Sequence, residues 1–197
     1  MKPSLSKNDK NMFNKYLDNF SVYFEYGSGD STYDALIKDN IKKVYSVESD
    51  YEWLTKLKNV IEERKDIKKK NKFISFYNEM DTQPNTLGYP GKNATYTQKI
   101  KYSNYILDLD ESEQKNIDLI LIDGRFRVAC CLKCFDIIKN DCIIAFDDFL
   151  NRSEYNIILD FFNIIDSTTD KRMVILKKNI NVNVPKQLIQ KYELIKI

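Results

Sequence analysis

The fold of this chain is decided by one short stretch, Val22-Tyr23-Phe24-Glu25-Tyr26-Gly27-Ser28-Gly29-Asp30-Ser31-Thr32. Its apolar, aromatic first half favours a β-strand, which stops at two glycines before a helical pattern begins. Glycine has no side chain to keep a ligand off the main chain, so Gly27 and Gly29 suit a molecule that lies against bare backbone. Ser31 and Thr32 are residue types that cap a helix. The stretch therefore predicts a strand, a tight turn and a ligand-binding helix N-terminus.

A second stretch supplies an acid beside this turn. Val44-Tyr45-Ser46-Val47-Glu48-Ser49-Asp50 has the composition of the next strand, with Glu48 near its end. Glu48 lies 19 residues after Gly29. A carboxylate at about this spacing is placed to accept hydrogen bonds from the hydroxyls of a ribose.

The composition bounds the class of protein. The chain has 197 residues, of which 43% are hydrophobic, so one domain over 1–197 with a real core is expected. The formal charge of +2 argues against a general polyanion-binding surface. There is no apolar run long enough for a membrane span, and the polar, lysine-rich start resembles no secretory signal. A cytoplasmic location is therefore expected.

Cysteine and histidine restrict the chemistry further. The four cysteines (Cys130, Cys131, Cys134 and Cys142) lie within 13 residues and follow a helical pattern, so buried reduced thiols are favoured over a redox or zinc pair. Histidine is absent. This excludes His-based zinc sites, hydrolases of the Ser-His-Asp or Cys-His type, and histidine general bases. Acid–base work falls to Asp, Glu, Lys or Tyr.

Strand and helix patterns alternate along the rest of the chain. The first strand is predicted to start at Val22, and further strands are predicted over Lys43–Ser49, Phe73–Tyr77, Ile117–Gly124, Cys142–Phe146 and Lys171–Lys177. A short last strand over Leu194–Ile197 is left open. Helices are predicted over Met12–Phe20 after a polar lead-in, Ser31–Asp39, Tyr51–Glu63, Ile100–Leu109, Arg125–Lys139, Ser153–Asp166 and from Pro185. Alternation of this kind predicts an α/β fold: a doubly wound, mostly parallel sheet of six or seven strands with helices on both faces.

The long segment 82–98 interrupts this pattern. It contains two prolines, two glycines, Tyr89 and Tyr96, and no apolar period. Loops of this length in compact domains are usually functional or disordered, and aromatic side chains favour function. Tyr89 and Tyr96 are therefore candidates for contact with a substrate. Tyr102 and Tyr105, in the helix that follows, are equally well explained as core residues.

The glycine turn does not suit a dinucleotide. In the G-x-G-x-x-G pattern the third glycine falls on Thr32, and a pyrophosphate would sit beside Asp30, with Glu25 nearby. Two acids near the turn suit a ligand that carries a positive charge and no phosphate. S-adenosylmethionine, which has a sulfonium, an amino-acid head and a ribose, fits this description.

Four segments in order resemble the class I S-adenosylmethionine-dependent methyltransferases, which have a Rossmann-like fold. They are Glu25–Thr32, Val47–Asp50, Asp123–Cys130 and Asp147–Phe149. They are similar to a compact branch that often occurs with glycan-building enzymes, some from large DNA viruses. Two departures stand out: Ser31 replaces the usual third glycine, and Asp147 stands where the branch often has histidine, which puts a base role there in doubt.

The resemblance implies a set of cofactor contacts. The methionine part would be surrounded by Gly27, Ser28, Gly29, Ser31 and Thr32, with Glu25 on its amino group. The ribose hydroxyls would bind to Glu48, and the adenine would be flanked by Ser49, Trp53 and either Asp81 or Asn78. The methyl group would lie beside Asp123. It also implies methylation of a hydroxyl on a sugar, glycan precursor or other small metabolite. Methylation of nucleic acid and a non-catalytic scaffold subunit are the alternatives.

Without histidine, a carboxylate is the available base for such a hydroxyl. Asp123 is the first candidate and Asp148 the second, with Arg125 assisting. Arg125 and Arg127 are also candidates to grip an anionic acceptor such as a nucleotide-sugar, although ion pairs with the acids are an equally good explanation. A divalent metal at Asp123 and Asp148 has no obvious third ligand, so no metal is expected.

Overall fold

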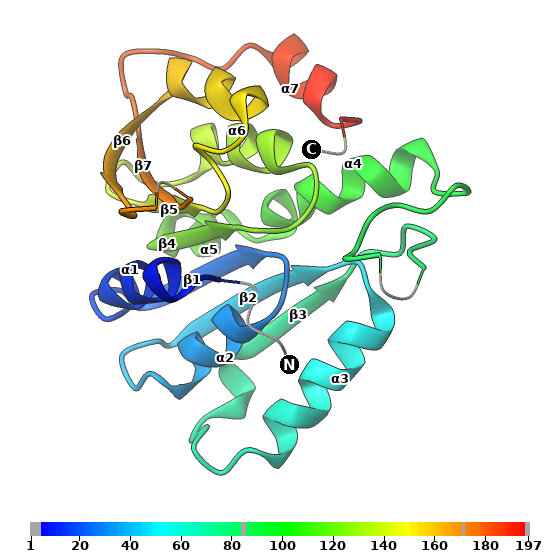
Figure 1. Ribbon diagram of the computed structural model, residues 1–197, viewed down its shortest axis with the longest axis vertical. Coiled ribbons are helices and arrows are strands. Elements are labelled where there is room, and N and C mark those ends of the chain that lie inside the picture. The colour runs from blue at the N-terminus through cyan, green and yellow to red at the C-terminus, as the bar shows by residue number, and fades with distance from the viewer. Residues whose placement is uncertain (1–4, 84–85, 171, 196–197) are drawn as a thin grey trace.

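The computed structural model describes residues 5–83, 86–170 and 172–195. Its centre is one sheet in the order β3-β2-β1-β4-β5-β7-β6 (Figure 1). The strands are β1 (Val22–Tyr26), β2 (Lys43–Glu48), β3 (Phe73–Tyr77), β4 (Leu119–Ile122), β5 (Ile143–Phe146), β6 (Phe162–Ser167) and β7 (Val174–Lys178). Strands β1 to β5 pair in parallel, whereas β7 is antiparallel to both β5 and β6. The predicted doubly wound, mostly parallel sheet is confirmed.

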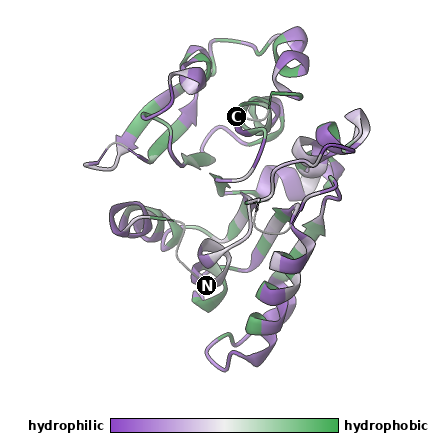
Figure 2. Ribbon diagram, turned by 45° about the vertical axis from the view of Figure 1, so that its right-hand side comes forward, coloured by the Kyte–Doolittle hydropathy of each residue, from purple (hydrophilic) through white to green (hydrophobic). Residues whose placement is uncertain are grey.

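Helices cover both faces of the sheet (Figure 1). They are α1 (Lys7–Leu17), α2 (Asp30–Ile37), α3 (Tyr51–Glu63), α4 (Tyr96–Asn104), α5 (Glu111–Asn116), α6 (Arg127–Ile137) and α7 (Lys186–Tyr192), with 3-10 turns η1 (Lys70–Lys72), η2 (Tyr105–Asp108) and η3 (Ser153–Asp160). One apolar core joins the sheet to α1, α2 and α3, and the other joins it to α4, α6 and η3. Figure 2 shows hydrophobic and hydrophilic residues alternating along α3, which buries Leu54, Leu57 and Ile61 on one side.

The strand order reverses between β1 and β4. From β1 the chain winds outward to β2 and β3, and then it crosses back to β4 on the other side. In open parallel sheets the loops at such a switch point diverge and leave a crevice at the carboxyl ends of the strands. The glycine turn after β1, the acid that ends β2 and the loop after β4 therefore meet at one edge of the sheet.

The prediction was wrong in the C-terminal third. The predicted helix Ser153–Asp166 is a 3-10 turn followed by strand β6, which forms an antiparallel hairpin with β7. A short apolar run fits the spacing of a helix as well as the alternation of a strand. Here the pairing with β7 at the sheet edge makes it a strand. Residues 194–195 form no strand, and 196–197 lie outside the described residues.

The other differences concern helix starts. Helix α1 begins at Lys7, inside the predicted lead-in, because Ser6 and Asp9 form a capping box. Helix α4 begins at Tyr96 rather than Ile100, because Thr95 and Gln98 form a second capping box. The polar helix α5 was not predicted. In the described ranges, no helix is long and apolar enough to cross a membrane.

Candidate functional site

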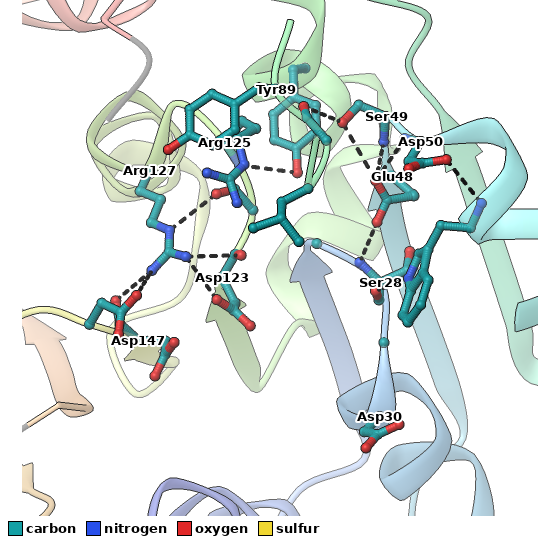
Figure 3. Close-up of a pocket in the computed structure, with 18 of the residues that line it drawn as sticks. Ser28, Asp30, Glu48, Ser49, Asp50, Tyr89, Asp123, Arg125, Arg127 and Asp147 are labelled. Carbon is teal, nitrogen blue, oxygen red and sulfur yellow. Dashed lines mark hydrogen bonds and ion pairs between the residues drawn. The ribbon is translucent and has the colours of Figure 1, made fainter. Parts of the chain in front are cut away.

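A cavity of about 580 Å³ opens at the carboxyl ends of β1, β2, β4 and β5 (Figure 3). One end is formed by the glycine turn and the start of α3, and the other by charged residues that follow β4 and β5. Its lining includes Gly27, Ser28, Gly29, Glu48, Ser49, Trp53, Leu87, Gly88, Tyr89, Asp123, Arg125, Arg127, Asp147, Asp148, Arg152 and Arg172. This is the position in which open α/β sheets bind ligands.

The two glycines of the turn have different roles. Gly27 has a φ of 96°, and a Cβ there would lie 2.9 Å from the backbone nitrogen and Cα of Gly124. Gly27 is therefore required for the close approach of the β1 and β4 ends. A Cβ on Gly29 would have no atom within 4 Å, although Gly29 lines the cavity. Gly29 is thus dispensable for packing, and its bare backbone faces open space.

Glu48 lies beside this turn at the end of β2. One carboxylate oxygen accepts a hydrogen bond from the Ser28 backbone N–H at 3.1 Å, and the other accepts from the N–H groups of Ser49 and Asp50 at 2.6 and 2.8 Å. These bonds fix the carboxylate at the cavity wall (Figure 3). Burial raises its pKa to about 7, in spite of the backbone donors, which favour the charged form.

Glu25 lies beneath the turn and outside the cavity lining. Its fully buried carboxylate accepts hydrogen bonds from the hydroxyls of Tyr23, Ser31, Thr32 and Ser46. Thr32 also accepts a hydrogen bond from the Gly29 N–H at 3.0 Å. Burial raises the pKa of Glu25, an effect that the hydroxyl donors oppose. The geometry supports Glu25, Ser31 and Thr32 as the support of the turn rather than as ligand contacts.

Part of the segment 82–98 lies at the cavity, next to the end of β2. The Ser49 hydroxyl donates to the Gly88 carbonyl at 2.9 Å, which ties this segment to the end of β2. Leu87, Gly88 and Tyr89 line the cavity. Residues 84–85 of this segment lie outside the described residues.

At the opposite end, Arg127 organises the loops after β4 and β5. It is buried, with its side chain 4% exposed, and its guanidinium donates to the Asp123 carboxylate at 2.8 Å and to the Asp147 carbonyl at 2.7 Å. Its Nε donates to the Gly124 carbonyl. Arg127 therefore positions Asp123, and the predicted substrate contact is not supported by this geometry.

Asp147 and Asp148 stand next to Asp123. Asp148 pairs with Arg172 at 2.8 Å and Arg152 at 3.1 Å. Asp147 is almost fully buried, and its Oδ1 has no hydrogen-bond partner among the described residues. Burial, together with the negative charges of Asp123 and Asp148, raises the pKa of Asp147 to about 8. Asp147 thus lines the cavity with a raised pKa, at the position where the sequence analysis put a base role in doubt.

The cavity gathers most of the predicted site residues. Those that line it are Gly27, Ser28, Gly29, Glu48, Ser49, Trp53, Tyr89, Asp123, Arg125, Arg127 and Asp148. Those that do not are Glu25, Ser31, Thr32, Asp81, Asn78 and Tyr96. Asp81 accepts a hydrogen bond from the Asn93 N–H, and Tyr96 is exposed at the start of α4. Tyr102, for which both explanations were open, is buried and also lines the cavity.

Arg152, Arg172 and Asp147 were missed as site residues. Arg172 precedes β7 and reaches the site only because β7 inserts between β5 and β6. No local motif marks this contact. In the portion of the chain that the structure describes, no group of three or more His, Cys, Asp or Glu side chains is arranged to hold a metal ion.

The two raised carboxyl pKa values predict how stability depends on pH. Asp147 and Glu48 keep their protons in the folded chain at pH values where the unfolded chain has lost them, so the free energy of unfolding falls as pH rises from about 4 to about 8. Each group contributes a slope of at most about 1.4 kcal/mol per pH unit. Denaturant unfolding at pH 5, 6.5 and 8 measures this slope.

Asp147→Asn and Glu48→Gln provide the control, since neither replacement residue titrates. The double variant is expected to lose less stability than the parent chain between pH 5 and 8. An equal loss in both proteins would show that other groups control the pH dependence.

Comparison with known proteins gives a likeness of fold. A methyltransferase-like protein from Silicibacter pomeroyi superimposes with a TM-score of 0.81 at 20% identity, over 97% of this chain and 94% of that chain. A candidate tRNA (m1A22) methyltransferase from Streptococcus pneumoniae, solved with S-adenosyl-L-methionine, gives 0.55 at 11% identity, over 94% and 78%. A candidate caffeoyl-CoA O-methyltransferase from Staphylococcus aureus gives 0.53 at 16% identity, over 90% and 86%.

No protein-family model and no curated protein sequence matches this chain. The structural likeness therefore shows the fold, which is the Rossmann-like fold of S-adenosylmethionine-dependent methyltransferases. It extends over nearly the whole chain.

Proposed function

We propose that this protein is an S-adenosylmethionine-dependent methyltransferase. The observation that carries the proposal is the placement of Glu48 and the Gly29 backbone on one cavity, at the switch point of a sheet with the methyltransferase strand order. Fold alone does not define an activity, so the argument rests on the chemistry of the cavity.

The cofactor end of the cavity fits this ligand. The open space over Gly29 accommodates the amino-acid part against bare backbone, and the Glu48 carboxylate is positioned to accept hydrogen bonds from ribose hydroxyls. Trp53, whose indole N–H donates to the Ser28 carbonyl at 2.7 Å, offers an aromatic face for the adenine.

When bound, the cofactor supplies an electrophilic methyl group. The protein aligns the acceptor with this methyl group and accepts the proton of the acceptor hydroxyl. We assign Asp123 as the group that accepts the proton of the acceptor hydroxyl, because it lines the cavity while Arg127 fixes its orientation. Asp148, which pairs with Arg127, Arg152 and Arg172, is the second candidate.

The acceptor in this proposal is a hydroxyl of a sugar, glycan precursor or other small metabolite. The support is a cavity lined by Tyr89 and Tyr102, together with the resemblance to a branch associated with glycan synthesis. We place the protein in the cytoplasm, which agrees with four buried cysteines that form no disulfide.

Nucleic acid is the second acceptor class, since one structural neighbour is a candidate tRNA methyltransferase. The test is the affinity for RNA at increasing salt. A dissociation constant that rises steeply between 50 and 200 mM salt, as counterion release requires, would favour this alternative over a small metabolite.

Replacing Glu48 with Ala is expected to weaken the binding of S-adenosylhomocysteine by about 1–3 kcal/mol, the usual consequence of losing a charged hydrogen-bond acceptor. Calorimetry at pH 8, above the pKa of about 7, measures the charged form. Glu63→Ala, at the exposed end of α3 and outside the cavity lining, is the control and should bind normally. Unchanged affinity in the Glu48 variant would remove Glu48 from the ribose site. Binding without turnover on any acceptor would instead favour a scaffold subunit.

A further inference from the structure

The arginines at the acceptor end of the cavity are not equivalent. Arg127, Arg152 and Arg172 each pair with at least one aspartate. The guanidinium of Arg125 makes no ion pair with any described residue, and its buried Nε has no hydrogen-bond partner there. Arginine is always charged, and a buried donor without a partner is unfavourable. Among the described arginines that line this cavity, Arg125 is thus the one left available for a ligand.

The position of Arg125 is fixed from two sides. Its guanidinium lies over the ring of Tyr89, with 4.2 Å between the guanidinium carbon and the ring centroid (Figure 3). Its backbone N–H donates to the Tyr102 hydroxyl at 3.4 Å. Stacking on an aromatic face uses the flat surface of the guanidinium and leaves its in-plane N–H donors directed outward. The group is therefore held in one plane before any ligand arrives.

We infer that Arg125, stacked on Tyr89, binds an anionic group of the acceptor, a phosphate or a carboxylate, two residues away from the proposed base Asp123. This rests on the proposed function. A planar guanidinium donates two parallel hydrogen bonds to either group, and so it orients the acceptor as well as attracting it. The acceptor class narrows from a hydroxylated metabolite to one that carries an anion near its reacting hydroxyl.

This assignment changes the roles given by the sequence. There, Arg125 and Arg127 were equal candidates to grip an anionic acceptor. In the structure, Arg127 is 4% exposed and engaged by Asp123 and two backbone carbonyls, whereas Arg125 is partly exposed in the cavity. Tyr89 gains a defined role too, since it orients Arg125 rather than only lining the pocket.

The test is anion binding to the chain with S-adenosylhomocysteine bound. Inorganic phosphate and acetate are titrated separately, and binding is followed by 31P line width for phosphate and 13C line width for labelled acetate. We expect the parent chain to bind at least one of them and Arg125→Gln to bind it at least about tenfold more weakly. Arg125→Lys, which keeps the charge without the planar fork, should fall between them. The relative strength of the two anions distinguishes a phosphate from a carboxylate.

Arg64→Gln is the matched control, because Arg64 also stacks on a tyrosine, Tyr33, at 4.5 Å but lies on the exposed surface. It should bind both anions as the parent does. Equal anion binding by Arg125→Gln and the parent, or binding of neither anion by the parent, would overturn the inference. So would a tenfold loss of S-adenosylhomocysteine affinity in Arg125→Gln, which would assign the guanidinium to the cofactor carboxylate. Failure of the proposed function appears separately, as a parent chain that does not bind S-adenosylhomocysteine; the anion titration is then made on the chain alone.

Discussion

Replacing Asp123 with Asn is expected to lower the turnover number by about 100-fold or more, the range in which a positioned general base contributes to a rate. The amide cannot accept the proton of an acceptor hydroxyl. It keeps the shape of the carboxylate and an oxygen that accepts the hydrogen bond from Arg127, so the loops after β4 and β5 should keep their arrangement. The affinity for S-adenosylhomocysteine should stay within about threefold of the parent value.

Asp148→Asn separates the two candidates for the base. Asp148 pairs with Arg152 and Arg172, so its loss should disturb those arginines and reduce the rate less than the Asp123 variant does. Methyl transfer to one acceptor, measured from pH 6 to 9 for both variants, provides the comparison. Full activity of Asp123→Asn would end its candidacy, and a larger loss in Asp148→Asn would transfer the role to Asp148.

Gly27→Ala is the prediction with the largest effect on stability. Ala at this position must adopt a φ of 96°, and its Cβ would lie 2.9 Å from backbone atoms of Gly124, which cannot move without separating β1 from β4. Backbone strain and the clash together cost about 3 kcal/mol or more, a large part of the total stability of a domain. Chemical denaturation of the purified variant measures the loss. A Gly27→Ala variant that fails to accumulate as folded protein would also agree with this prediction.

Gly29→Ala is the matched control for this variant. The two glycines are two residues apart in one turn, but a Cβ on Gly29 meets no atom within 4 Å and its φ of −178° is open to any residue. Its free energy of unfolding should stay within about 0.5 kcal/mol of the parent value. Equal destabilisation by the two substitutions would contradict the assignment of close packing to Gly27 alone.

The sheet was predictable because each strand carries its own local signal. Leu119–Ile122 is a continuous apolar run, as a strand covered on both faces requires, and the glycine turn marks the end of β1. The edge hairpin was not predictable in this way. The apolar residues of Phe162–Ser167 satisfy helical spacing as well as alternation, and only pairing with β7 makes them a strand.

The site was predictable where it is built from residues that end strands. Glu48 and Asp123 fall in the cavity because the carboxyl ends of adjacent parallel strands meet at one edge. The sequence did not show that Glu25 points below the turn toward hydroxyl groups, because the face on which a strand residue lies depends on register. Nor did it show Arg172, which tertiary pairing alone brings to Asp148.

Calorimetric titration of S-adenosylhomocysteine into the parent chain and into Gly29→Ala tests the central claim most directly. The parent chain should bind at a single site, and the variant should be as stable as the parent but bind at least about tenfold more weakly, because its methyl group occupies the space where the ligand meets the backbone. Equal binding by both proteins, or no binding by the parent chain, would contradict the proposal that the cofactor lies against this turn.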